Sequence, residues 1–126
     1  MSEKPQHGTF CWNELITDGA DKAGDFYTKL LGWKKEPFPG DMPYTILKAG
    51  DKSVGGLMAK APQMGDMPNQ WISYITVDDV DATAKQAEKL GGKIVCPPMD
   101  IPTVGRFTII SDPTSALIGL ITFPSE

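Results

Sequence analysis

The sequence predicts an α+β fold built from two βαβββ modules, and three observations support that prediction. Residues 12–32 align with residues 72–92 at a shift of 60 positions. Residues 45–57 align with residues 108–120 at a shift of 63, so a longer loop is expected in the second half. Each half also reads as one strand, one helix and three further strands. An internal repeat of this length indicates two copies of one supersecondary unit.

Each module is expected to open with a strand, at about 8–17 and 70–77, and to continue with a helix, at about 19–32 and 79–91. Apolar residues recur at helical spacing in both helical segments. Glycine closes each helix, at Gly32 and at Gly91–Gly92. We interpret two pairs of acids at the strand-to-helix junctions as capping boxes and not as catalytic dyads: Asp18 with Asp21, and Asp78 with Asp81.

Three strands are expected after each helix, separated by segments rich in proline and glycine. They are placed at residues 33–38, 43–49 and 53–60 in the first module, and at residues 93–98, 106–111 and 116–123 in the second. The first module then spans 8–61 and the second spans 70–123, with a linker at 62–69. The chain of 126 residues has the length of a single domain, 1–126.

Composition and charge exclude several classes of protein. Hydrophobic residues make up 40% of the chain, the net charge is -4, and no basic run occurs, so nucleic acid is not an expected partner. No apolar stretch approaches the roughly 20 residues that cross a bilayer, and the first ten residues lack the apolar core of a signal peptide. We therefore expect a cytoplasmic protein that does not bind membranes. Cys11 and Cys96 lack metal-binding or redox spacing and are expected to be reduced, buried thiols.

Three segments carry a resemblance to a known family: FYTKLLGW at 26–33, KLGGKIV at 89–95 and SDPTSALIGLITF at 111–123. They resemble the vicinal oxygen chelate superfamily, which includes glyoxalase I, bleomycin resistance proteins and extradiol dioxygenases. The resemblance covers roughly residues 8–123 and is strongest for an uncharacterised glyoxalase-related subgroup. One residue departs from the family pattern, because Ser115 stands where the last hairpin usually has glycine.

The resemblance implies a U-shaped mixed sheet around a cavity, with the helices outside, as in the glyoxalase, bleomycin resistance and dihydroxybiphenyl dioxygenase fold. It also implies a homodimer. Metal enzymes of the family take one ligand from the first strand and one from the last strand of each module. These positions fall on Trp12, Gly56, Ile72 and Gly119, none of which offers a lone pair suited to a metal ion. His7, the one histidine, lies in the polar N-terminal tail, so we predict no metal site and no cofactor.

A carboxylate in the first strand is the main candidate for function. Because strand side chains alternate between faces, Glu14 shares the face of Trp12, and the repeat places Tyr74 at the equivalent position of the second module. Together with Met58 and Arg106, these residues are the predicted ligand-binding set. Glu14 is the catalytic candidate, as general acid or base. It could equally pair with Arg106 or accept the Tyr74 hydroxyl in a purely structural role.

Three functions remain open from the sequence. The first is a protein that binds a small, partly apolar molecule without a metal. The second is a metal-free isomerase or lyase that uses Glu14 for proton transfer. The third is a metal-dependent enzyme similar to lactoylglutathione lyase, with ligands at other positions.

Overall fold

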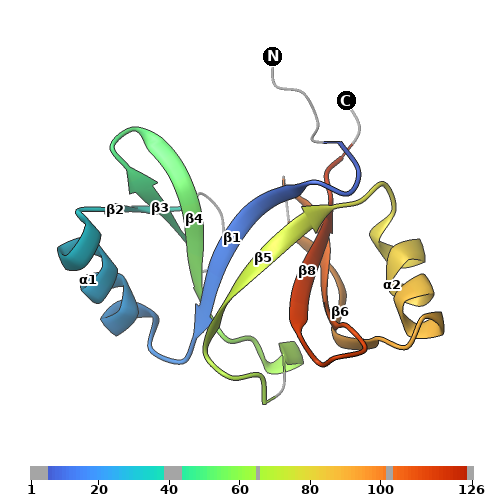
Figure 1. The fold of residues 1–126 in the computed structure, drawn as a ribbon. Coiled ribbons are helices and arrows are strands. Elements are labelled where there is room, and N and C mark those ends of the chain that lie inside the picture. Colours follow the sequence, from blue (N-terminus) through green and yellow to red (C-terminus); the bar gives the residue numbers. More distant parts are fainter. Residues whose placement is uncertain (1–5, 39–43, 65, 102–103, 125–126) are drawn as a thin grey trace. The chain divides into compact units, whose positions relative to one another are not determined.

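A computed structural model describes residues 6–38, 44–64, 66–101 and 104–124 of the chain. These residues form two α-helices, one short 3₁₀ helix and a set of β-strands, shown in Figure 1. In chain order they are β1 (Phe10–Thr17), α1 (Ala20–Leu31), β2 (Lys34–Pro37), β3 (Tyr44–Ala49), β4 (Lys52–Ala59), η1 (Pro62–Met64), β5 (Gln70–Thr76), α2 (Val80–Lys89), β6 (Lys93–Ile101), β7 (Gly105–Ser111) and β8 (Leu117–Thr122). The order confirms the predicted α+β class and the duplicated βαβββ pattern.

The chain forms two compact units, which we call the α1 unit and the α2 unit. The α1 unit contains Trp12–Pro62 and Asp66–Ile72, and the α2 unit contains Met1–Cys11, Gln63–Gly65 and Ser73–Glu126. The division between the units falls inside two strands. The first two residues of β1 belong to the α2 unit, and the first three residues of β5 belong to the α1 unit. Each of these strands therefore contributes backbone to both units.

In the α1 unit the strand order is β2-β3-β4-β1, with antiparallel neighbours except for the parallel pair of β4 and β1. Helix α1 packs on one face of these strands (Figure 1). Leu15, Leu47 and Leu57 form the buried cluster under the helix, with exposures of 6%, 1% and 4%. Burying such a side chain stabilises the folded state by about 1.5–3 kcal/mol. This cluster fixes which face of β1 looks toward the helix.

The α2 unit repeats the same arrangement with β6-β7-β8-β5, and the parallel pair is again the first strand with the last. Val77, Val80, Ile110 and Leu120 form its core against α2. The first residues of the described chain extend this unit. The Gly8 amide donates to the Thr76 carbonyl at 2.8 Å, and other backbone bonds continue along the start of β1.

The strand registers reproduce the repeat that the sequence predicts. Glu14 lies opposite Gly56 in the parallel pair of the α1 unit, and Tyr74 lies opposite Gly119 in the parallel pair of the α2 unit. These are the positions that the shifts of 60 and 63 relate. The two units therefore share their pairing register as well as the order of their elements.

The helix ends differ from the predicted capping boxes. The N-cap of α1 is Gly19, with no side-chain cap, and the N-cap of α2 is Asp79, whose carboxylate accepts from the Ala82 amide at 3.1 Å. The assignment of Asp18 and Asp78 as caps is therefore wrong. Asp18 instead pairs with Lys60 at 3.3 Å. The prediction for the C-terminus of α1 is confirmed, because Gly32 has a left-handed φ of 73° and its amide donates to the Thr28 carbonyl.

The final hairpin contains a strained residue at the position where the resemblance expects glycine. Ser115 has a φ of 75°, in the left-handed region that side chains with a Cβ rarely adopt. Asp112 holds the turn, because its Oδ1 accepts from the Thr114 amide at 2.7 Å, from the Thr114 hydroxyl at 2.6 Å and from the Ala116 amide at 3.1 Å. Those bonds maintain the turn despite the cost at Ser115.

In the part of the chain that the structure describes, neither helix has the length and apolar character needed to cross a membrane.

Candidate functional site

The candidate site lies on one face of the α1 unit. Leu15 packs under α1, so the alternation of β1 directs Trp12 and Glu14 to the opposite face. The registers of β3 and β4 place Tyr44, Gly56 and Met58 on that same face. We call these five residues the Glu14 face.

Glu14 is a buried acid, with 5% of its surface exposed, and it contacts a tyrosine. The Tyr44 hydroxyl hydrogen-bonds to the Glu14 carboxylate and also accepts the Trp12 indole N–H, with Nε1 and the hydroxyl oxygen 2.8 Å apart. An indole N–H only donates, so the Tyr44 hydroxyl accepts from Trp12. The hydrogen bond to Glu14 raises the pKa of Tyr44, as it does when the single proton of the phenol is donated to the carboxylate. The result is a directed chain from Trp12 through Tyr44 to Glu14.

The electrostatics of this chain keep Tyr44 protonated. Burial raises the pKa of Tyr44 well above its ordinary value, and the negative charge of Glu14 raises it further. The hydrogen bond from Trp12 has the opposite, smaller effect on this pKa. Tyr44 is therefore a permanent donor to Glu14 at any pH near neutrality.

In each unit a tyrosine covers the last-strand glycine at which the resemblance expects a metal ligand. In the α1 unit, a Cβ at Gly56 would collide with the Tyr44 hydroxyl and ring. In the α2 unit, a Cβ at Gly119 would collide with the ring of Tyr74. These glycines allow the aromatic ring to lie directly on the backbone. A metal-ligating side chain at either position has no room unless the tyrosine moves.

The residues at the four positions do not fit the metal that the fold family implies. Trp12 and Ile72 supply no ligand atom, and Gly56 and Gly119 have no side chain and are covered. Among the described residues, no group of three or more His, Cys, Asp or Glu side chains is placed to hold an ion. Metal enzymes of this type need such a cluster, because three or four ligand atoms must converge on the ion.

Tyr74 belongs to the α2 unit, where it is 3% exposed. Its ring meets that of Phe107 edge to face, with the centroids 6.1 Å apart. Its backbone carbonyl accepts a weak hydrogen bond from the Cys11 thiol at 3.6 Å. Cys11 and Cys96 are both free, and burial raises the pKa of each thiol. A raised thiol pKa suits the structural role expected for both.

Arg106 lies on the other face of its sheet from Tyr74. Its neighbour Phe107 shares the face of Tyr74, so Arg106 points toward α2. It binds Asp81 with two bonds, Nε to Oδ2 at 2.8 Å and Nη2 to Oδ1 at 3.1 Å, and Asp100 with one at 3.0 Å. The Arg106 hydrogen bond lowers the pKa of Asp81. The structure thus places Arg106 in an ion-pair network beside α2 and does not bring it together with Tyr74.

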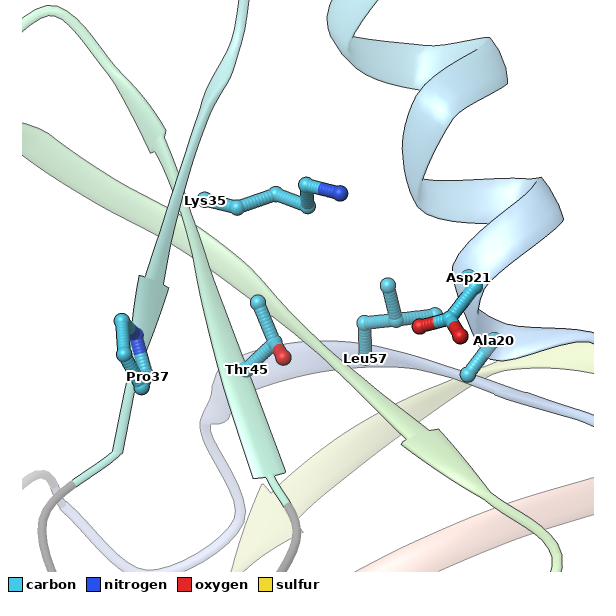
Figure 2. A pocket seen from close by; sticks show the side chains of 6 residues that line it. All are labelled: Ala20, Asp21, Lys35, Pro37, Thr45 and Leu57. Carbon is cyan, nitrogen blue, oxygen red and sulfur yellow. The ribbon is translucent and has the colours of Figure 1, made fainter.

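A separate small pocket of about 170 Å³ lies on the helix side of the α1 unit. Figure 2 shows it between the first turn of α1 and the edge strands, and its lining residues are Ala20, Asp21, Lys35, Pro37, Thr45 and Leu57. Its volume is below the roughly 300–1,000 Å³ of typical ligand sites. The amine of Lys35 is already paired with Asp25 at 3.1 Å. The patterns in the sequence did not predict this pocket, which lies across the sheet from the Glu14 face.

Sequence reasoning missed Tyr44 as the partner of Glu14. A signal for it exists in the repeat, because the shift of 63 residues relates Tyr44 to Phe107. Both units therefore carry an aromatic residue at this position, but its contacts differ: Tyr44 itself covers Gly56, whereas Phe107 contacts Tyr74, which covers Gly119.

The chain matches one family model and several curated proteins. The family model described as the Glyoxalase/Bleomycin resistance protein/Dioxygenase superfamily matches residues 9–120. Among curated proteins, the "Putative glyoxylase CFP32" of Mycobacterium bovis is 44% identical over 116 residues, which cover 90% of this chain and 44% of the relative. The anthracycline biosynthesis protein DnrV of Streptomyces peucetius is 29% identical over 123 residues, covering 86% of this chain and 45% of that protein. The chain thus spans less than half the length of these relatives.

Solved structures share the fold. The methylmalonyl-CoA epimerase of Mycobacterium tuberculosis matches with a TM-score of 0.57 and 18% identity, covering 94% of this chain and 89% of the other. The Mn(II)-bound glyoxalase of Novosphingobium aromaticivorans matches with a TM-score of 0.56 and 20% identity, covering 92% of this chain and 39% of the other. These matches confirm the expected architecture. The family model over residues 9–120 and the 44% identity to a relative over most of the chain show that the chain belongs to the glyoxalase/bleomycin resistance protein/dioxygenase superfamily.

Proposed function

We propose that this chain binds a small, partly apolar molecule at the Glu14 face and does so without a metal ion. The observation that supports this most is the covering of Gly56 by Tyr44. Where the family's metal enzymes carry a ligand side chain, this chain carries a hydroxyl that donates to Glu14. An aromatic wall with a few placed polar groups is typical of small-molecule sites.

The composition of the Glu14 face supports binding of an apolar body. Trp12, Tyr44 and Met58 are all half-buried, so each keeps surface that a ligand can cover. Methionine adapts its shape to different ligands, and aromatic rings contribute a large contact area. Small-molecule recognition also fits the relatives, one of which is named for anthracycline biosynthesis.

The test begins with the protein purified without added ligands. Denaturing it and analysing the extract by mass spectrometry identifies a copurifying molecule, and calorimetry measures its rebinding. We expect about one molecule per chain, rebinding that survives dialysis against a chelator, and a loss of at least tenfold in affinity for Trp12→Ala. The matched control is Trp33→Ala, because Trp33 packs in the cluster under α1. Equal losses in both variants, or binding that needs a divalent ion, would contradict the proposal.

A second candidate is a metal-free isomerase or lyase in which Glu14 transfers a proton. The burial of Glu14 favours it, because acids used in proton transfer often sit in partly apolar surroundings. Incubating the recovered ligand with protein in heavy water tests this candidate. Exchange of a carbon-bound proton that stops in Glu14→Gln supports catalysis, and exchange that continues rules out Glu14 as the base.

The metal-dependent reaction is the least supported of the three functions. The relatives named as glyoxylases favour it. The residues at Gly56 and Gly119 do not, because each position is covered by a tyrosine. A metal-dependent site would need ligands from outside the four family positions.

A further inference from the structure

The C-terminal half of α1 carries exposed apolar side chains that continue onto the start of β5. Phe26, Leu30 and Leu31 each expose more than half of their surface, and Trp71 exposes 38%. Phe26 and Leu30 are neighbours on the helix surface, as are Tyr27 and Leu31, because each pair is four residues apart. The Tyr27 ring meets Phe26 and Trp71 edge to face, with centroids 5.0 and 5.4 Å away. We call these five residues the α1 patch, and all of them belong to the α1 unit.

The second module shows that the fold does not require an apolar surface here. At the positions related by the shift of 60 residues, the second module is polar or small where the α1 patch is apolar: Gln86, Ala87 and Gly91 correspond to Phe26, Tyr27 and Leu31. Only Leu30 keeps its residue type, as Leu90. Two copies of one supersecondary unit therefore differ in what their helices present to the surroundings, and the α1 patch needs an explanation other than packing within the unit.

The rings of the α1 patch are ordered by contacts with one another. The Trp71 indole N–H donates to the Tyr27 hydroxyl at 3.1 Å, so it already has an acceptor. Tyr27 also stacks on Trp33, with centroids 6.0 Å apart and an interplanar angle of 26°. Side chains that are fixed in advance lose little conformational entropy when a partner covers them. The α1 patch is thus suited to contact with another apolar protein surface.

The charges on α1 favour a partner that is identical to this chain. Helix α1 carries two acids and two lysines, all exposed: Asp21, Lys22, Asp25 and Lys29. A helix with this balance has no net charge with which to select nucleic acid or an anionic membrane. In a two-fold symmetric dimer the same surface meets itself, so an excess of either charge would repel. Apolar side chains on a charge-balanced helix avoid that repulsion.

The exposed apolar area is close to what a dimer interface needs. From the exposed fractions of Phe26, Leu30, Leu31 and Trp71, we obtain roughly 400 Å² of apolar surface for side chains of this size. A stable interface buries about 800 Å² on each partner, of which slightly more than half, or about 450 Å², is apolar. The α1 patch can therefore supply most of the apolar part of one such interface.

From these observations we propose that the α1 patch is the surface through which two copies of this chain associate, with α1 of one copy facing α1 of the other. The resemblance to the family implies a homodimer, and the inference adds the surface that forms it. It goes beyond the proposed function, because the α1 patch includes none of the residues of the Glu14 face.

The experiment measures the molar mass of the full chain by sedimentation equilibrium, at concentrations from about 1 to 200 μM, a range that covers weak and strong dimers. We expect the wild type to be a dimer within this range. Leu30→Lys should raise the dissociation constant of the dimer at least tenfold, because it places a charge in the α1 patch. Leu90→Lys is the matched control, since Leu90 occupies the equivalent position and is 68% exposed, against 61% for Leu30. It should leave the dissociation constant within about twofold of the wild type.

Each other outcome overturns the inference. A wild type that stays monomeric up to the highest concentration shows that the α1 patch does not bring two copies together. A dimer that persists unchanged in Leu30→Lys, or that is weakened equally by both substitutions, shows that another surface forms it. Thermal unfolding checks that the variants are folded. If Leu30→Lys does not fold, Phe26→Gln takes its place, because it gives α1 the residue that the second module has at the equivalent position.

Discussion

The hydroxyl of Tyr44 occupies the space into which a side chain at Gly56 would project. This contact has two consequences for the strand pair that carries Glu14. It removes the room for a metal-ligating side chain at the position where the resemblance expects one, and it supplies a hydrogen bond from Tyr44 to Glu14.

Gly56→Ala should destabilise the protein by about 1–3 kcal/mol, because the added methyl group overpacks against Tyr44. Denaturant unfolding measures the free energy. In a Tyr44→Ala background the same substitution should cost less than about 0.5 kcal/mol, since the colliding ring is gone. An unchanged cost in that background would show that the two residues are not in contact.

Tyr44→Phe should lower the free energy of unfolding by about 1–3 kcal/mol at neutral pH. The change leaves the buried Glu14 carboxylate and the Trp12 N–H without their shared partner. Urea unfolding gives the value. Tyr27→Phe is the matched control, because the Tyr27 hydroxyl accepts from Trp71 at 3.1 Å in an exposed contact. A smaller loss for Tyr44→Phe than for Tyr27→Phe would contradict the Glu14 network.

The raised pKa of Tyr44 predicts a pH dependence at the alkaline end. The unfolded chain releases the tyrosine proton at a pKa of about 10, whereas the folded chain retains it. Stability from this group is therefore complete below pH ~10 and declines as pH rises above it, up to the folded pKa. Unfolding measured from pH 8 to 11 should show a steeper decline in the wild type than in Tyr44→Phe. Parallel profiles would show that Tyr44 titrates normally.

The hydrogen bonds to Asp112 lead us to expect a loss of stability at acidic pH, whereas the loss due to Tyr44 occurs at alkaline pH. The Thr114 hydroxyl and amide and the Ala116 amide hold the pKa of Asp112 below its ordinary value. The stability that Asp112 contributes is present above the unfolded pKa of about 3.9 and is lost as pH falls through the folded pKa. A carbon-13 NMR titration of the carboxyl group should show this lowered value, and Thr114→Val should raise it. If the pKa of Asp112 were the same in the wild type and in Thr114→Val, the Thr114 hydroxyl would not be the cause of the lowered value.

Ser115→Gly should stabilise the protein by about 0.5–1 kcal/mol, since glycine adopts the observed φ of 75° without steric cost. Ser53→Gly is the control. Ser53 is exposed in strand β4, where glycine should destabilise by a similar amount. The unfolding temperature should therefore rise in Ser115→Gly and fall in Ser53→Gly. A shift of both temperatures in the same direction would contradict the strain at Ser115.

The sequence predicted the fold because the repeat links local patterns at fixed distances. The helix of each half, its strands and the register of Glu14 with Gly56 all follow from the two shifts. The caps were harder to predict. Whether Asp78 or Asp79 caps α2 depends on the backbone geometry of one turn, which residue type alone does not determine.

The site could be predicted only in part, because its contacts depend on long-range register. The face of Glu14 follows from alternation along one strand, and the structure agrees. Its contact with Tyr44 depends on two further strand pairings, and a shift of one residue in either would move the phenol to the other face. The same sensitivity applies to Arg106, which is one residue from Phe107 and points the other way.

The most direct test of the account is to locate the bound ligand by NMR. The backbone and indole N–H signals of isotope-labelled protein are followed while the copurifying molecule is added. The account predicts that the largest shifts fall on the Trp12 indole N–H and the amides of Gly56 and Met58. Shifts confined to Ala20, Asp21 and Lys35, which line the pocket beside α1, would contradict it.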